Sequence, residues 1–123
     1  MTEELIVAII IRKDLGMSCG KIAVQAAHGI TNMFMHMEEV GALYVRIVNK
    51  WYHECDQKKI ILKVKDKSEL HAIESEIQYN NLPFEGITDL GLTQLKGETL
   101  TGICVYPMAH EQIDPIIRLL KLL

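Results

Sequence analysis

The chain of 123 residues has few cysteines, no long apolar run and no excess of positive charge. Its three cysteines, Cys19, Cys55 and Cys104, form no C-x-x-C pair, which argues for reduced thiols rather than a disulfide framework. The close pair His53 and Cys55 has no second pair at zinc-finger spacing, so we expect no structural metal. No apolar stretch reaches the roughly 18 residues that cross a bilayer, so we expect no transmembrane helix.

The net charge of −3 at pH 7 is not that of a typical nucleic-acid-binding protein. Five lysines nevertheless fall within ten residues: Lys58, Lys59, Lys63, Lys65 and Lys67. Such a run is usually the solvated face of a strand. The alternative is a local track for RNA phosphates, which needs only a patch of positive charge.

Length and composition indicate an ordinary globular protein. Hydrophobic residues make up 49% of the chain and charged residues 24%. We therefore expect a single domain over residues 1–123. Glu3 and Glu4 stand where a signal peptide would carry basic residues, so we expect a cytoplasmic protein.

The hydrophobic pattern alternates strands and helices. Leu5 to Arg12 predicts a strand buried on both faces. The further predicted elements are helices from Ser18 or Cys19 to Met37 and from Val40 to Tyr52, an edge strand from Lys59 to Lys65, a helix from Asp66 to about Asn80, and a hairpin of strands from Phe84 to Asp89 and from Leu100 to Tyr106. The last helix starts either at Asp114, with Pro115 in its first turn, or near Ala109 with a bend at Pro115.

Strands separated by helices imply crossover connections and a sheet covered on both sides. The final hairpin makes that sheet mixed. The predicted fold class is therefore α/β, a three-layer α/β/α sandwich with a four-stranded mixed, mostly parallel sheet.

A polar stripe opens the helix that follows the first strand. Lys21, Gln25 and His28 are spaced by four and three residues, so they share one side of that helix. A separate apolar stripe faces the core: Ile22, Ala26, Ile30, Met33 and Met37. A polar stripe just past a strand is where α/β folds usually place their chemistry.

Lys21 lies near the helix N-terminus, where the helix dipole disfavours a positive charge. This favours a functional role over a solvated surface lysine, because Lys21 and the free N–H groups would attract phosphate or a developing oxyanion. The segment Gly16-x-x-x-Gly20-Lys21 is one residue short of a P-loop, and Ile22 replaces the Ser or Thr that holds magnesium. We therefore exclude a nucleotide triphosphatase.

Each remaining candidate has a structural alternative. Gln25 either orients a water or is a helix-surface amide. His28 is a candidate general base, yet a histidine among apolar residues is more often a hydrogen-bonded structural residue. Asp89 either forms a turn or serves as a catalytic carboxylate. Cys19, next to Lys21 at a helix start, is a candidate reactive thiol of a thiol-dependent enzyme or redox sensor.

Residues 12–28 match a long motif, R-x-D-L-x-M-x-x-G-K-x-A-x-Q-x-x-H. Its specified positions are Arg12, Asp14, Leu15, Met17, Gly20, Lys21, Ala23, Gln25 and His28. Weaker matches follow in order at Trp51, Lys59 to Val64, Asp89 to Thr93, Thr99 to Thr101, Pro107 and Leu119 to Leu123. Over nearly its whole length the chain resembles the type-2 peptidyl-tRNA hydrolases of archaea and eukaryotes.

The resemblance implies that water cleaves the ester between a peptide and the terminal ribose of tRNA, with no metal and no organic cofactor. The catalytic roles would fall on Lys21, Gln25, Asp89, Thr93 and Thr101. The candidate substrate-binding residues are Arg12, Lys13, His28 and Thr99. The resemblance further implies a peptidyl-tRNA partner held mainly through phosphates, no membrane partner, and a homodimer. It requires Lys21 and Asp89 to converge in one cleft.

Several positions depart from the family pattern. Leu90 and Leu92 replace the alanine and arginine of a D-A-G-R-T motif, and Cys19 replaces a lysine. Glu98 and the bulky Tyr106 both stand in place of glycines. Loss of positive charge weakens RNA binding unless it is compensated. The alternative function is therefore a catalytically weak relative that serves as a protein- or RNA-binding module.

Overall fold

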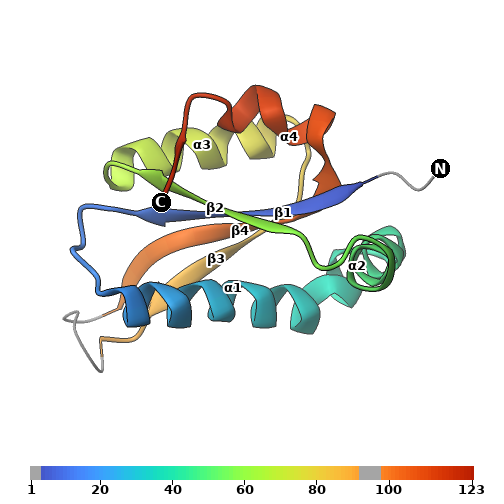
Figure 1. Ribbon diagram of the computed structural model, residues 1–123, viewed down its shortest axis with the longest axis horizontal. Helices are drawn as coiled ribbons and strands as arrows, with labels where there is room; N and C mark the ends of the chain where they lie inside the picture. The colour runs from blue at the N-terminus through green and yellow to red at the C-terminus, as the bar shows by residue number, and fades with distance from the viewer. Residues whose placement is uncertain (1–3, 92–97) are drawn as a thin grey trace.

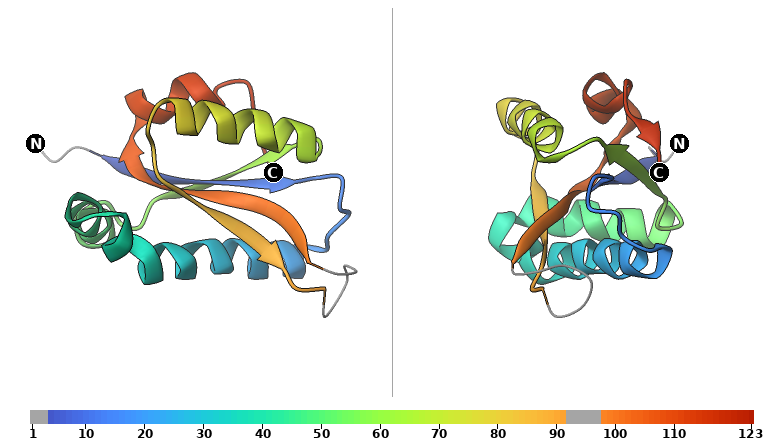
Figure 2. Two further views of the ribbon diagram at one scale, coloured as in Figure 1. Left: turned by 180° about the vertical axis from the view of Figure 1, so that it is seen from behind. Right: turned by 90° about the vertical axis from the view of Figure 1, so that its left-hand side faces the viewer.

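The computed structural model describes residues 4–91 and 98–123, in which helices cover both faces of one mixed sheet (Figure 1). The elements are, in chain order, β1 (Leu5–Arg12), α1 (Cys19–Val40), α2 (Ala42–Glu54), β2 (Lys59–Val64), α3 (Lys67–Tyr79), β3 (Phe84–Asp89), β4 (Thr99–Ala109), α4 (His110–Ile117) and β5 (Lys121–Leu122). Helices α3 and α4 lie on one face, and α1 and α2 lie on the other, as Figure 2 also shows from behind and from the side. The predicted α/β class is confirmed.

Within the described residues the sheet has five strands, in the order β3-β4-β1-β2-β5. Strands β1 and β2 pair in parallel, whereas the β1–β4, β2–β5 and β3–β4 pairs are antiparallel. The prediction of four strands and a mostly parallel sheet is therefore wrong. After the hairpin, β4 enters between β3 and β1 and runs against both. The two-residue β5 is too short to leave a pattern in the sequence, and it flanks β2, which was predicted at the edge.

Strand β1 lies at the middle of the sheet and separates two hydrophobic clusters. Its side chains alternate between the faces, as the period of a strand requires. Ile6, Ala8 and Ile10 join the cluster under α3 and α4, and Leu5, Val7, Ile9 and Ile11 join the cluster under α1 and α2. Burial on both faces confirms the prediction for this strand. Each fully buried isoleucine contributes roughly 1.5–3 kcal/mol relative to an exposed one.

Helix α1 begins as the sequence predicts, and Ser18 caps it by accepting the backbone N–H of Lys21 at 3.1 Å. Met33 is buried under the helix, and Ile22, Ala26, Ile30 and Met37 pack partly buried beside it, which confirms the apolar stripe. The helix continues three residues past the predicted end, to Val40. Gly41 then separates α1 from α2 with a φ of 149°, a conformation that favours glycine.

The later elements resolve the open predictions. Asp66 caps α3 by accepting the N–H of Glu69 at 2.9 Å. Helix α4 begins at His110 and contains Pro115, so the earlier of the two predicted starts is correct. Strands β3 and β4 form the predicted antiparallel hairpin, with β4 extending to Ala109.

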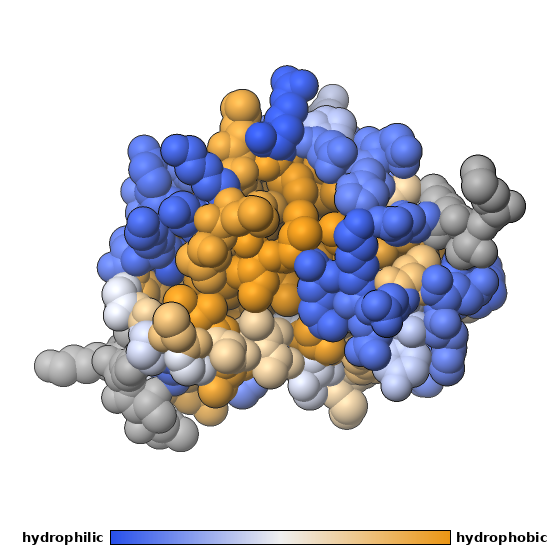
Figure 3. Space-filling model, in the orientation of Figure 1, coloured by the Kyte–Doolittle hydropathy of each residue, from blue (hydrophilic) through white to orange (hydrophobic). Residues whose placement is uncertain are grey.

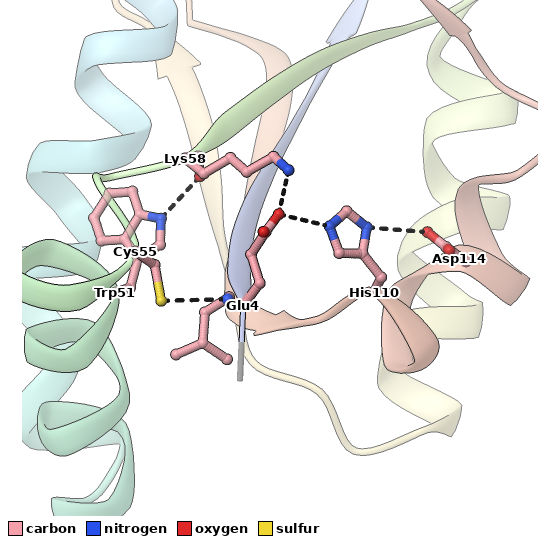
Figure 4. Close-up of polar contacts among 7 residues, drawn as sticks. Glu4, Trp51, Cys55, Lys58, His110 and Asp114 are labelled. Carbon is pink, nitrogen blue, oxygen red and sulfur yellow. Dashed lines mark hydrogen bonds and ion pairs between the residues drawn. The ribbon is translucent and has the colours of Figure 1, made fainter. Parts of the chain in front are cut away.

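Polar contacts join the start of β1 to the α2–β2 connection and to α4 (Figure 4). Glu4 forms an ion pair with Lys58 and lies 3.4 Å from Nε2 of His110. Nε1 of the buried Trp51 donates to the Lys58 carbonyl at 2.8 Å. These contacts hold the amino end of β1, whereas the carboxyl ends of β1, β2 and β3, which run in the same direction, lie at the opposite end of the sheet.

Candidate functional site

The predicted lysine and carboxylate meet where α1 begins and β3 ends. Lys21 lies in the first turn of α1, and Asp89 is the last residue of β3. Their side chains form an ion pair and are only 9% and 6% exposed, respectively. The two groups that the resemblance requires to converge are therefore neighbours, although they lie far apart in the chain.

Three donors surround the Asp89 carboxylate. Oδ1 pairs with Lys21 and accepts a hydrogen bond from Nε2 of Gln25 at 3.3 Å. Oδ2 accepts the backbone N–H of Gly91 at 2.9 Å. The hydrogen bond from Lys21, helped by that from Gly91, holds the pKa of Asp89 below its ordinary value of 3.8 against the opposing effect of burial. Asp89 is therefore ionised at neutral pH.

Gln25 lies completely buried behind the ion pair, so the alternative of a helix-surface amide is wrong. Its Oε1 accepts the hydroxyl of Thr101 at 2.7 Å, and that hydroxyl also lies 3.1 Å from the carbonyl of Ile87. Because Thr101 donates to the oxygen of the amide, the amide nitrogen faces Asp89. Strand β4 thus sets the orientation of a side chain on α1, which in turn orients the carboxylate on β3.

A pocket of about 430 Å³ opens beside the ion pair. Its lining residues are Lys21, Val24, His28, Asn32, Gly86, Thr88, Asp89 and Leu90. This volume is in the range of small-molecule sites. His28 is exposed on the wall of this pocket rather than packed in the core. The pocket can admit a polar group to within reach of both an ammonium and a carboxylate.

Asn32 is a pocket residue that the sequence prediction missed. It follows His28 by four residues, so it extends the polar stripe of Lys21 and His28 by one turn of α1. Its Nδ2 donates to the carbonyl of Gly86 at 3.4 Å, which fastens α1 to β3. The helical period was the signal that could have found it.

The predicted substrate-binding residues do not all lie at the Lys21–Asp89 site. Thr99 pairs with Asp89 in the β3–β4 register and so lies beside the ion pair. Arg12 binds Asp14 through two hydrogen bonds of 3.0 and 2.8 Å and donates to the Leu100 carbonyl at 2.9 Å. Arg12 therefore joins the end of β1 to the start of β4. Lys13 lines a second pocket.

Thr93 and Leu92 lie outside the described residues. Of the other departures from the family motif, Leu90 is 67% exposed and lies on the pocket wall. Tyr106 lies in the core instead, where its ring packs on Tyr44 with centroids 5.9 Å apart and its hydroxyl donates to Glu85 at 2.7 Å. The bulk of Tyr106 therefore fills the core and does not narrow the pocket.

Two further observations concern residues 4–91 and 98–123. No three of their His, Cys, Asp and Glu side chains are grouped in a way that could hold a metal ion. None of the helices formed by these residues is long and apolar enough to span a membrane. Cys19, the candidate thiol, is exposed at the first residue of α1.

Comparison with known sequences gives a consistent result. The family model described as "Peptidyl-tRNA hydrolase PTH2" matches residues 5–123. A protein of Methanococcus maripaludis named peptidyl-tRNA hydrolase is 37% identical over 116 residues, which cover 94% of this chain and 97% of that protein. One of Methanocaldococcus jannaschii with the same name is 38% identical over 115 residues, covering 94% and 96%.

Among solved structures, a protein of unknown function from Agrobacterium superposes with a TM-score of 0.65. The match covers 99% of both chains at 12% sequence identity. At that identity the likeness concerns the fold alone.

Proposed function

This chain belongs to the peptidyl-tRNA hydrolase PTH2 family, and on that premise we propose that its Lys21–Asp89 site hydrolyses the ester between a peptide and tRNA. Cleavage would release free tRNA for reuse. The observation that carries the proposal is the ion pair of Lys21 and Asp89 on the wall of a pocket, with Gln25 and Thr101 buried behind it. This set supplies a cation for developing negative charge and an anion for the attacking water.

Asp89 acts on the water. A carboxylate with a lowered pKa is a weak base but a good hydrogen-bond acceptor, so it orients the attacking water and takes its proton only as the new bond forms. Gln25 and Thr101 keep the carboxylate in place, because a fixed geometry saves the entropy of assembling the reactants.

Lys21 acts on the substrate. Its ammonium stabilises the negative charge that develops on the ester carbonyl oxygen or on the leaving ribose oxygen. The low exposure of the Lys21 side chain strengthens this effect, because little water competes for the charge. Thr93 completes the proposed catalytic set, and His28 and Thr99 contact the substrate beside it.

The test is hydrolysis of a labelled peptidyl-tRNA by the wild-type chain and by the near-isosteric variants Lys21→Met and Asp89→Asn. Each variant should lower kcat roughly 10²–10³-fold, the usual cost of removing one group that stabilises the transition state. Lys50→Met, on α2, is the matched control and should keep full activity. No turnover by the wild-type chain would remove the enzyme claim, and unchanged turnover in both site variants would remove the assigned site.

The same assay separates the alternatives. A chain that binds tRNA without turnover would be the binding module that the altered Leu90, Leu92 and Glu98 suggest; Tyr106 no longer supports that alternative, since it lies in the core. Full activity in Cys19→Ser would dismiss a thiol-dependent mechanism.

We also propose a cytoplasmic homodimer, as the resemblance implies. The exposed side chains of Leu122 and Leu123 support an assembly surface, and Figure 3 shows apolar surface gathered on the side of the molecule that carries the C-terminal segment. The molar mass in solution tests this: light scattering should give twice the 14.0 kDa of one chain.

A further inference from the structure

A second pocket, of about 350 Å³, lies at the carboxyl ends of β1 and β2. It is lined by Lys13, Lys63, Val64, Lys65, Glu69, Leu119, Leu120 and Lys121. Four lysines thus line one pocket, and Glu69 is the single acidic residue among its lining residues. We call the four the lysine cluster. They come from three separate parts of the chain, so no run in the sequence displays the cluster.

Strand pairing holds these lysines close together. Lys63 and Lys121 are directly opposite in the antiparallel β2–β5 pair, and the backbone N–H of Lys13 donates to the carbonyl of Val64 at 2.9 Å. Like charges directly opposite on neighbouring strands are destabilising. The proximity of Lys13, and then burial and Lys121, lower the pKa of Lys63 below its ordinary value of 10.5. An anion placed between these ammonium groups would relieve the repulsion.

The lysine cluster and the Lys21–Asp89 pair share one edge of the sheet. Lys13 follows β1, Lys65 follows β2, and Asp89 ends β3. Figure 1 shows the carboxyl ends of these three strands and the start of α1 at the same side of the molecule, with α2 at the opposite side. A polymer bound at one site can therefore extend toward the other.

We propose that the lysine cluster is a binding site for RNA backbone phosphates, which holds the body of the tRNA while its peptidyl end lies beside Lys21. The inference rests on the proposed function for the identity of the polyanion. It accounts for RNA binding by a chain of net charge −3, because the positive charge is concentrated where the substrate needs it. It also compensates for the positive charges lost at Cys19 and Leu92.

The test compares Lys63→Gln/Lys121→Gln with Arg46→Gln/Lys50→Gln, a matched pair on α2 that changes the net charge equally. Binding of deacylated tRNA is measured by fluorescence anisotropy from 50 to 200 mM salt. Two lost phosphate contacts reduce the salt slope by about 1.8, so the affinity ratio of wild type to variant should shrink roughly tenfold over this range. Lys63→Arg/Lys121→Arg should bind as the wild type does.

Hydrolysis supplies the second readout. The Gln/Gln variant should raise KM for peptidyl-tRNA about tenfold at low salt and leave kcat unchanged, because it removes binding that is equal in ground and transition states. A peptidyl ester of adenosine, which lacks the tRNA body, should be cleaved equally well by variant and wild type. Lys13→Gln, outside the strands, should give about half the change in slope.

The outcomes distinguish the two proposals. Wild-type salt dependence in both the Gln/Gln variant and Lys13→Gln would overturn the phosphate site even if the enzyme turns over. Competition by inorganic phosphate, with no difference in tRNA binding between variant and wild type, would assign the cluster to a small anion and overturn it as well. Lysine-dependent tRNA binding without any hydrolysis would leave the phosphate site standing and remove the proposed function.

Discussion

Replacing Thr101 with valine removes one hydroxyl from the buried chain of hydrogen bonds and changes the side-chain volume very little. Oε1 of Gln25 then loses the donor at 2.7 Å in a place that water does not reach, since both residues are 0% exposed. An unsatisfied buried acceptor costs about 1–3 kcal/mol. For a chain of 123 residues, each kcal/mol corresponds to about 4 °C in Tm. Thr101→Val should therefore lower Tm by about 4–12 °C.

The same change should impair catalysis without touching the substrate. Once its oxygen has no donor, the Gln25 amide can rotate, and Asp89 loses the hydrogen bond from Nε2 at 3.3 Å. A small displacement of a positioned group costs up to about 10²-fold, so we expect kcat to fall between tenfold and 100-fold.

Calorimetry and single-turnover hydrolysis below the Tm of the variant measure the two effects separately. Thr101→Ser keeps the hydroxyl and is the matched control, with kcat near that of the wild type. Wild-type kcat in Thr101→Val would refute the idea that β4 orients the carboxylate through Gln25, whatever happens to Tm.

Three further predictions follow from other parts of the structure. Because Lys21 holds the pKa of Asp89 below 3.8, the stability that this ion pair contributes should be complete above pH 3.8 and be lost as the pH falls below it. The acid-unfolding curves of the wild type and Asp89→Asn should therefore differ above pH 3.8 and converge below it. Gly29→Ala would place a methyl group 2.8 Å from the β-carbon of Cys104 on β4. The overpacking costs about 1–3 kcal/mol and outweighs the roughly 1 kcal/mol gained in helix propensity, so the Tm should fall. A higher Tm would contradict the packing. Tyr106→Phe should cost about 1 kcal/mol by removing the donor to Glu85, as urea unfolding would measure, and leave hydrolysis unchanged; a gain in activity would show that the tyrosine restricts the site.

Local patterns in the sequence predicted most of the elements. A short uninterrupted run rich in β-branched apolar residues is typical of a strand buried on both faces, and β1 is one. The spacing of Lys21, Gln25 and His28 placed them on one side of α1, and Asp66 marked the start of α3. These features depend on residues within a few positions of one another, so the sequence displays them directly.

The balance of parallel and antiparallel pairs was predicted wrongly, although the hairpin was correct, because that balance depends on which distant strands pair. The alternation of strands and helices is typical of a parallel sheet, but β4 pairs with both β3 and β1 in antiparallel fashion. The lysine run from Lys58 to Lys67 was considered as one track, yet the structure gathers Lys63 and Lys65 from it with Lys13 and Lys121 from other parts of the chain. Hydrogen bonding between strands brings these four lysines together, and no local pattern in the sequence predicts it.

The order of residues along the polymer was enough to show that an ammonium, an amide and an imidazole share one helical side, because a helix has a constant period. It could not show that the amide is buried and held by a hydroxyl from β4, or that four lysines surround a single pocket. These contacts form only when strands far apart in the chain come within hydrogen-bonding distance, because the residues that bury the amide and surround the pocket are not neighbours in the sequence.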